Sequence, residues 1–120
     1  MVAPDKEATV ANEIPRPDVL EALPMPDEIR DDMQELVRVA GALVWNRPGI
    51  PAAQRSMVTI AMLTALGRWD ELRFHIAFGL DNGLTRDEIC EVLMHAAVYA
   101  GFPASVSAMR IASEEFAARP

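Results

Sequence analysis

Two side chains that can move or orient a proton stand near the middle of the chain. Glu71 and His75 are four residues apart, a spacing that places them one above the other on a helix. There the carboxylate can fix the imidazole tautomer and strengthen the histidine as a proton carrier. The same spacing is also typical of an ordinary pair on a solvated helix face, worth roughly a few tenths of a kcal/mol. The spacing alone leaves both interpretations open.

The neighbours of this pair on the same helix favour a concealed position. At about 100° per residue, four polar residues fall within an arc of roughly 60°: Arg68, Glu71, His75 and Asn82. Apolar residues border this polar strip on both sides: Phe74 and Phe78 on one, and Trp69, Leu72, Ile76 and Leu80 on the other. We expect the solvated sector around Asp70, Arg73 and Asp81. A concealed strip requires a partner network or a function, because an unpaired buried charge costs several kcal/mol.

Two arginines bracket the turn before a long apolar segment. Arg47 lies on one side of this turn, and Arg55 lies on the other, close to Ser56 and Thr59. A guanidinium in apolar surroundings needs an anionic partner. That partner can be an internal carboxylate or the carboxylate of a bound substrate held by two parallel N–H groups, and both interpretations stay open.

A second group of titratable residues is less informative. Four of them share one side of a later helical segment: Glu88, Glu91, His95 and Tyr99. We interpret His95 as a solvated or interface residue rather than as a catalyst, because that side is contiguous with Asp87, Met94 and Cys90. The lone cysteine, Cys90, excludes an internal disulfide and the paired-thiolate motifs of zinc and redox sites. We interpret it as an inert small hydrophobic residue and expect no bound metal.

The composition is that of one globular domain. The chain has 120 residues, of which 51% are hydrophobic and 24% charged, which argues against separate domains and against disorder. Eleven basic and 18 acidic residues give a net charge of -7, the wrong sign for binding nucleic acid or anionic lipid. The lone cysteine, the charged N-terminal sequence and the absence of a long apolar run predict a cytoplasmic protein.

Hydrophobic periodicity predicts an all-α fold. We expect helices over 27–46, 51–67, 69–82, 85–101 and 102–117, with no competing strand pattern. Pro51 suits the first position of the second helix, and Gly83 is expected to close the third in a left-handed conformation. The run from Thr85 to Glu88 fits a capping box, in which each side chain satisfies the other residue's backbone amide.

The first quarter of the chain has a different character. Its prolines forbid ordinary helix interiors: Pro4, Pro15, Pro17, Pro24 and Pro26. We therefore predict a Pro-rich N-terminal arm over 1–26 and a helical domain over 27–120. Docking of the arm across a neighbouring subunit is favoured over mobility, because Ile14, Val19 and Leu20 would otherwise be exposed to water.

The second predicted helix indicates an oligomer. Between Pro51 and Leu66 it is apolar on nearly every side, whereas a surface helix keeps one broad polar face. Four other short helices cannot cover it, so we predict that neighbouring subunits do.

Five sequence blocks, in this order and with these separations, resemble the carboxymuconolactone decarboxylase family: WNRPG (45–49), RSMVTIAM (55–62), ELRFH (71–75), DNGLT (81–85) and HAAVYAGFPA (95–104). The resemblance covers roughly Met33 to Phe116. Alkylhydroperoxidase relatives place a C-x-x-C pair seven and four residues before the histidine, where this sequence has Arg68 and Glu71. Thiol peroxidase chemistry is therefore not expected. The acidic residue that those relatives use for proton relay corresponds here to Ser56.

The resemblance implies cofactor-independent decarboxylation of 4-carboxymuconolactone, or of a closely related carboxylated lactone, to the enol-lactone in aromatic catabolism. The small-molecule substrate supplies its own electron sink, so no cofactor or metal is implied. We assign His75 as the proton donor and Glu71 as the residue that orients it. Arg55 and Arg47 are assigned as carboxylate anchors, and His95 and Tyr99 as further residues lining the site.

The resemblance also implies a compact helical domain assembled as a trimeric or hexameric ring, with sites near subunit contacts. Two alternatives remain open for the function. One is action on a different small molecule in specialised metabolism. The other is a non-catalytic oligomeric binding module in which Glu71 and His75 only pair internally.

Overall fold

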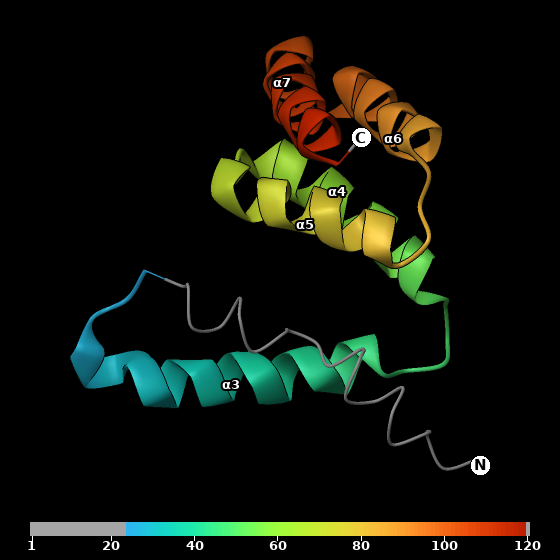
Figure 1. The fold of residues 1–120 in the computed structure, drawn as a ribbon. Coiled ribbons are helices and arrows are strands. Elements are labelled where there is room, and N and C mark those ends of the chain that lie inside the picture. Colours follow the sequence, from blue (N-terminus) through green and yellow to red (C-terminus); the bar gives the residue numbers. More distant parts are fainter. Residues whose placement is uncertain (1–23, 120) are drawn as a thin grey trace. The chain divides into compact units, whose positions relative to one another are not determined.

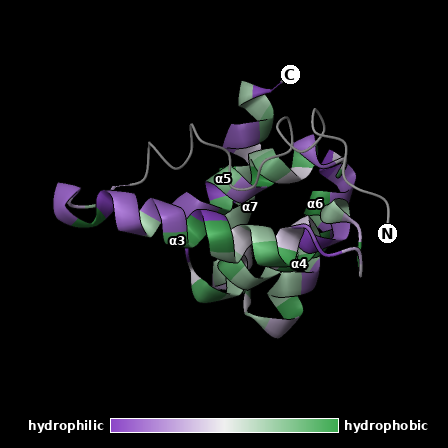
Figure 2. Cartoon of the chain, turned by 90° about the horizontal axis from the view of Figure 1, so that it is seen from below, coloured by the Kyte–Doolittle hydropathy of each residue, from purple (hydrophilic) through white to green (hydrophobic). Residues whose placement is uncertain are grey.

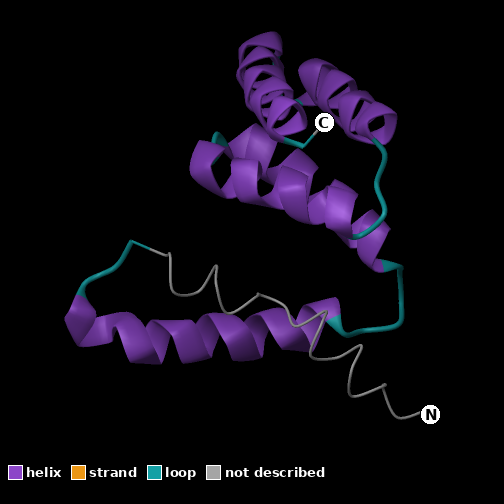
Figure 3. Ribbon diagram, viewed as in Figure 1, coloured by secondary structure: helices purple, strands orange, loops and turns teal. Residues whose placement is uncertain are grey.

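The computed structural model describes residues 24–119, so almost all of the predicted N-terminal arm lies outside the described residues. Within this range the regular structure is entirely helical, as predicted (Figure 3). The described chain divides after Gly49 into two units. One contains α3 (Asp27–Trp45), and the other contains α4 (Ala52–Leu66), α5 (Trp69–Asp81), α6 (Arg86–Tyr99) and α7 (Phe102–Ala118) (Figure 1). The predicted arm boundary at residue 26 stays a prediction.

Helix α3 is amphipathic. Asp27 and Glu28 place negative charge in its first turn, where they interact favourably with the helix dipole. Figure 2 shows hydrophobic residues alternating with hydrophilic ones along the helix. No residue of α3 is buried by the described chain, and Leu36 and Leu43 are 58% and 70% exposed. The apolar side chains of α3 are therefore left exposed within its own unit.

Helices α4 to α7 form two hairpins packed on one another. The contacts are densest between α4 and α5 and between α6 and α7, and the α4–α5 hairpin lies across the α6–α7 hairpin (Figure 1). Their shared core is aliphatic: Ile60, Leu72, Ile76, Leu84, Ile89, Leu93, Ala108, Ile111 and Ala112. Each fully buried Leu or Ile contributes about 1.5–3 kcal/mol relative to an exposed position, so this core holds α5 firmly against α4 and α7.

Local sequence signals account for the helix ends. The Glu88 amide donates to Thr85 Oγ1 at 3.0 Å and the Thr85 amide to Glu88 Oε1 at 2.9 Å, which confirms the predicted capping box. Gly83 has a φ of 102° after α5, a conformation that glycine adopts without steric cost. Pro51 differs from the prediction. It is the N-cap residue of α4, with an extended backbone, rather than the first residue inside the helix.

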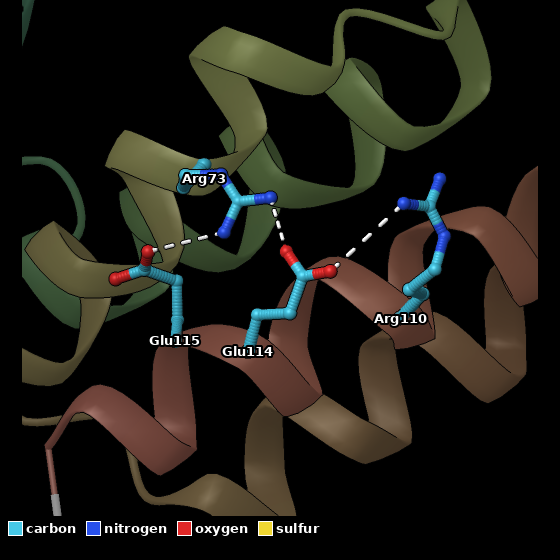
Figure 4. Close-up of polar contacts among 4 residues, drawn as sticks. All are labelled: Arg73, Arg110, Glu114 and Glu115. Carbon is cyan, nitrogen blue, oxygen red and sulfur yellow. Dashed lines mark hydrogen bonds and ion pairs between the residues drawn. The ribbon is translucent and has the colours of Figure 1, made fainter.

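Helix α7 is tied to α5 by ion pairs. Arg73 on α5 bonds to Glu114, and it lies 3.4 Å from Glu115, while Arg110 lies 3.9 Å from Glu114 (Figure 4). At the other end of α5, Arg119 pairs with Asp81 at 2.7 Å. Asp81 is exposed and Arg73 is partly exposed, as predicted for the solvated sector, and both side chains also form these ion pairs. Their partners are about forty residues away in sequence and could not be identified from helical spacing.

Among the described residues, no helix combines the length and hydropathy that a membrane span requires.

Candidate active site

His75 lies against two aromatic side chains in the middle of α5. Its ring packs edge-on against Phe74, with centroids 5.0 Å apart, and against Phe78, with centroids 6.0 Å apart. Phe74 and Phe78 are themselves stacked at 5.7 Å. The Nδ1 atom of His75 is buried, although the residue as a whole is half-buried. The aromatic wall predicted on this side of the helix is confirmed, and it gives the imidazole an apolar environment.

Burial controls the charge of this imidazole. It lowers the pKa of His75 from its ordinary value of 6.5 to about 4, because an apolar environment disfavours the charged form. The negative charge of Glu71 acts in the opposite direction and raises the pKa, but its effect is smaller. His75 is therefore neutral at physiological pH in this structure.

The polar strip on α5 is concealed only in part. His75 and Asn82 are half-buried, whereas Glu71 and Arg68 are exposed at the start of the helix. The prediction that the whole strip is concealed is therefore wrong for Glu71 and Arg68. They lie in the first turn and just before it, where the described residues leave them open to solvent.

Asn82, at the other end of the strip, makes a contact that sequence reasoning missed. Its Nδ2 atom donates a hydrogen bond to Ser56 Oγ on α4 at 3.0 Å, and Ser56 is completely buried. Gly79 is closely packed on this side of α5, because a Cβ atom there would lie 3.0 Å from Leu84 Cδ1 and 3.3 Å from Ile60 Cδ1 on α4. A glycine four residues after His75 was the available sequence signal for a close helix approach.

The two arginines belong to different units of the chain. Arg55 is on α4, directly before Ser56, and its Nε atom is buried. The Thr59 hydroxyl donates to the Arg55 carbonyl at 2.9 Å. Arg47 is exposed and follows α3, so it lies in the first unit. Of the two arginines, Arg55 is therefore the one that belongs to the same unit as His75.

His95 and Tyr99 lie at a separate hollow. A groove of about 700 Å³ runs between α4 and α6, with mainly apolar walls that include Met57, Ala61 and Met62. His95 and Tyr99 line it, with their rings stacked at 5.0 Å. Neither His75 nor Glu71 is among the residues that line this groove.

Cys90 is exposed and lines a second hollow of about 480 Å³ between α6 and α7, together with Arg86 and Phe116. No cluster of three or more metal-ligating side chains is found in residues 24–119.

Comparison with known proteins identifies the family. Residues 32–114 match the profile of the carboxymuconolactone decarboxylase family. The chain belongs to this family. It is 48% identical to the 4-carboxymuconolactone decarboxylase of Acinetobacter baylyi over 91 residues, which cover 75% of this chain and 68% of that protein. It is 42% identical to the nitrosuccinic acid decarboxylase npaB of Metarhizium robertsii over 77 residues, which cover 63% of this chain and 54% of that protein.

Membership of the carboxymuconolactone decarboxylase family confirms the resemblance drawn from the sequence blocks. All four helices around His75 overlap the matched range, and the Ser56–Asn82 hydrogen bond lies inside it. The two similar proteins described above are named as decarboxylases. This member is accordingly an enzyme of the carboxy-lyase kind.

Proposed function

We propose that this chain decarboxylates 4-carboxymuconolactone, or a closely related carboxylated lactone, without a cofactor. The observation that carries the proposal is the position of His75. Its imidazole is half-buried against two phenyl rings with a carboxylate one turn away. The 48% identity to a protein named 4-carboxymuconolactone decarboxylase supports this choice of substrate.

The substrate carries its own electron sink. When carbon dioxide leaves the saturated ring carbon, the bonding electron pair moves through the ring double bond into the lactone carbonyl and forms a dienolate. One proton added to carbon then completes the enol-lactone. The protein must therefore bind the carboxylates, limit their solvation, stabilise the developing oxygen charge and deliver one proton.

His75 is the proposed proton donor. The free imidazole is neutral because burial lowers its pKa to about 4. A bound anionic substrate beside it would raise that pKa, since a nearby negative charge favours the imidazolium form. Substrate binding thus loads the donor with the proton that the dienolate needs. Glu71 supports the same form through its charge, and its proposed role is to orient the ring.

Arg55 and Arg47 are the proposed carboxylate anchors. A guanidinium holds a carboxylate through two parallel N–H groups. Local positive charge would also attract a dianionic substrate to a protein with a net charge of -7. His95 and Tyr99 remain proposed as lining residues of secondary importance, contributed to the site from the α4–α6 groove or from a neighbouring subunit.

A second candidate substrate is nitrosuccinate. The 42% identity to a protein named nitrosuccinic acid decarboxylase favours it over other carboxylic acids. In that molecule the nitro group accepts the electron pair as a nitronate, so the same requirements apply: two carboxylates, an acceptor group and one proton. The common substrate class is a dicarboxylate in which the carbon that loses carbon dioxide is conjugated with an electron acceptor.

A homo-oligomer, trimeric or hexameric, is part of the proposal. Three large apolar residues at helical spacing on α4 are exposed in the single chain: Val58 at 48%, Met62 at 54% and Leu66 at 70%. Such a stripe is expected to be covered by a partner subunit.

The experiment offers both substrates to the purified protein and follows carbon dioxide release. Faster turnover of 4-carboxymuconolactone supports the proposal, and faster turnover of nitrosuccinate replaces it with the second candidate. Release from neither compound, by a folded protein, would reject both and favour the non-catalytic binding module.

A further inference from the structure

The groove between α4 and α6 has the dimensions of a peptide-binding surface. Its volume is about 700 Å³, and its walls are mainly apolar. Val58 and Met62 line it from α4, and both are exposed in the single chain. Along α6 the groove runs from Glu88 to Ala100, which at 1.5 Å per residue is about 18 Å. A long apolar surface of this kind marks a site of interaction with another segment of protein.

Two features of the groove select its occupant. The first is an aromatic surface, since the rings of His95 and Tyr99 are stacked at 5.0 Å and line the groove. The second is negative charge, since Glu88 and Glu91 line the groove and no lysine or arginine is among its lining residues. Aromatic-lined grooves bind proline-rich segments in the polyproline II conformation, and carboxylates favour a segment with a positive charge.

A segment of this chain that lies outside the described residues meets these requirements. It is IPRPDVL, residues 14–20. Proline fixes its own φ at about −65° and pushes the residue before it toward an extended backbone. The sequence therefore restricts the run from Ile14 to Pro17 to conformations such as polyproline II, and binding orders it at a small cost in entropy. An extended chain over residues 14–20 spans about 19 Å, close to the length of the groove.

The side chains of this segment also match the groove in type. In polyproline II every third residue lies on the same side, which places Ile14, Pro17 and Leu20 in one apolar row. Arg16 lies beside this row and is the basic residue of the segment. An apolar row suits the apolar walls of the groove, and a guanidinium can both pair with a carboxylate and stack on an aromatic ring.

We propose that residues 14–20 of a neighbouring subunit bind in the α4–α6 groove. The apolar row lies against the exposed side chains of α4, and Arg16 lies beside Glu91. A neighbouring subunit is the source, because the proposed homo-oligomer already requires a partner over α4. His95 and Tyr99 then act in assembly, as the aromatic surface that receives the segment. The inference rests on the proposed oligomer and not on the proposed reaction.

Disulfide trapping in the full chain tests the contact directly. The Cys90→Ser background leaves only introduced thiols, and a disulfide requires two Cα atoms within about 7 Å. We expect copper phenanthroline to join most chains of Arg16→Cys/Glu91→Cys to a second chain, which appears as multiples of 13.2 kDa on a non-reducing gel. Arg16→Cys/Ser113→Cys is the matched control and should stay largely unlinked. Ser113 is also exposed, but it lines the hollow between α6 and α7 instead.

The pattern of linkage separates the possible occupants. A disulfide between chains at Glu91→Cys, with little at Ser113→Cys, supports the inference. A disulfide within one chain places the segment on its own subunit and overturns the inference. Equal yields in the two proteins, or no disulfide in either, overturn it as well. If the parent is an oligomer and the disulfide is absent, only the segment contact is rejected, and the oligomer and the proposed reaction stand.

An exchange of charges tests the predicted ion pair. Arg16→Glu and Glu91→Arg each bring like charges together and should raise the subunit dissociation constant about tenfold. The double variant should return it to within about threefold of the parent value. Asp87→Arg is the matched control, because Asp87 is an exposed acidic residue of α6 that does not line the groove. Combined with Arg16→Glu, it should restore nothing.

Sedimentation of a dilution series measures these dissociation constants, and melting curves show that each variant is folded. A folded double variant that assembles no better than Arg16→Glu alone overturns the inference.

Discussion

Glu71 and His75 lie one turn apart on α5, and the charge of Glu71 acts on the imidazole of His75. The Glu71 carboxylate raises the pKa of His75, while burial lowers it by more, to about 4. The imidazole is thus held in its neutral form by its environment, next to a group that favours the charged form. An added negative charge, such as a substrate carboxylate, shifts that balance toward protonation.

The first prediction concerns stability against pH. The folded pKa of about 4 lies below the ordinary value of 6.5, so the unfolded chain takes up a proton first as the pH falls. His75 therefore costs no stability above pH 6.5 and destabilises the fold progressively between pH 6.5 and about 4. The full loss is about 3 kcal/mol. Urea denaturation of the parent and of His75→Gln, compared across this range, measures it.

The difference between these two proteins removes the contribution of the carboxylates, which titrate in both. It should grow as the pH falls from 6.5, in favour of His75→Gln. A difference that stays constant between pH 7 and pH 4 would show that His75 titrates normally in the folded chain.

The second prediction concerns Glu71→Gln. Removing the charge that favours imidazolium should lower the pKa of His75 further below about 4. NMR titration of the imidazole C–H signals measures this, and His95, the second histidine of the chain, serves as an internal reference. Asp70→Asn is the matched control, since it removes an exposed carboxylate from the same first turn. It should move the His75 pKa less than Glu71→Gln does. Equal shifts in the two variants would contradict a specific effect of Glu71.

The third prediction concerns the end of α7. Arg86 donates to the Phe116 carbonyl at 2.8 Å, and its guanidinium lies 5.1 Å from the centre of the Phe116 ring. We expect Arg86→Met to lower the free energy of unfolding by about 1 kcal/mol, because it leaves the last carbonyls of α7 without this donor. Thermal denaturation measures the change. Arg110→Met, which removes one exposed pair at 3.9 Å from Glu114, should have a smaller effect, and the reverse order would contradict this assignment.

The fourth prediction concerns assembly. If a partner subunit covers the exposed α4 side chains, Met62→Glu should disperse the oligomer into chains of 13.2 kDa. Analytical ultracentrifugation measures the mass. Gln54→Glu adds a charge at an exposed polar position of the same helix and should leave the oligomer intact. A parent protein that is monomeric at micromolar concentration would exclude the oligomer.

Local signals in the sequence were sufficient for the helices but not for their contacts. The Thr85 capping box and the apolar periodicity depend on residues a few positions apart, so they can be read from the sequence alone. The structure confirms both. The partners of Arg73 and Asn82 are 41 and 26 residues away, and one helix cannot indicate what packs against it. The exposure of Glu71 was missed for the same reason. Helical spacing shows which side of the helix a residue is on, but not how far the neighbouring helices cover that side.

In the proposed reaction, His75 delivers the proton that completes decarboxylation. The most direct measurement is the rate of carbon dioxide release from 4-carboxymuconolactone by the parent protein and by His75→Gln at equal concentrations of folded protein. We expect turnover by the parent and a fall in kcat of about 10²–10⁴-fold in the variant. A folded His75→Gln protein that releases carbon dioxide at the parent rate would contradict it.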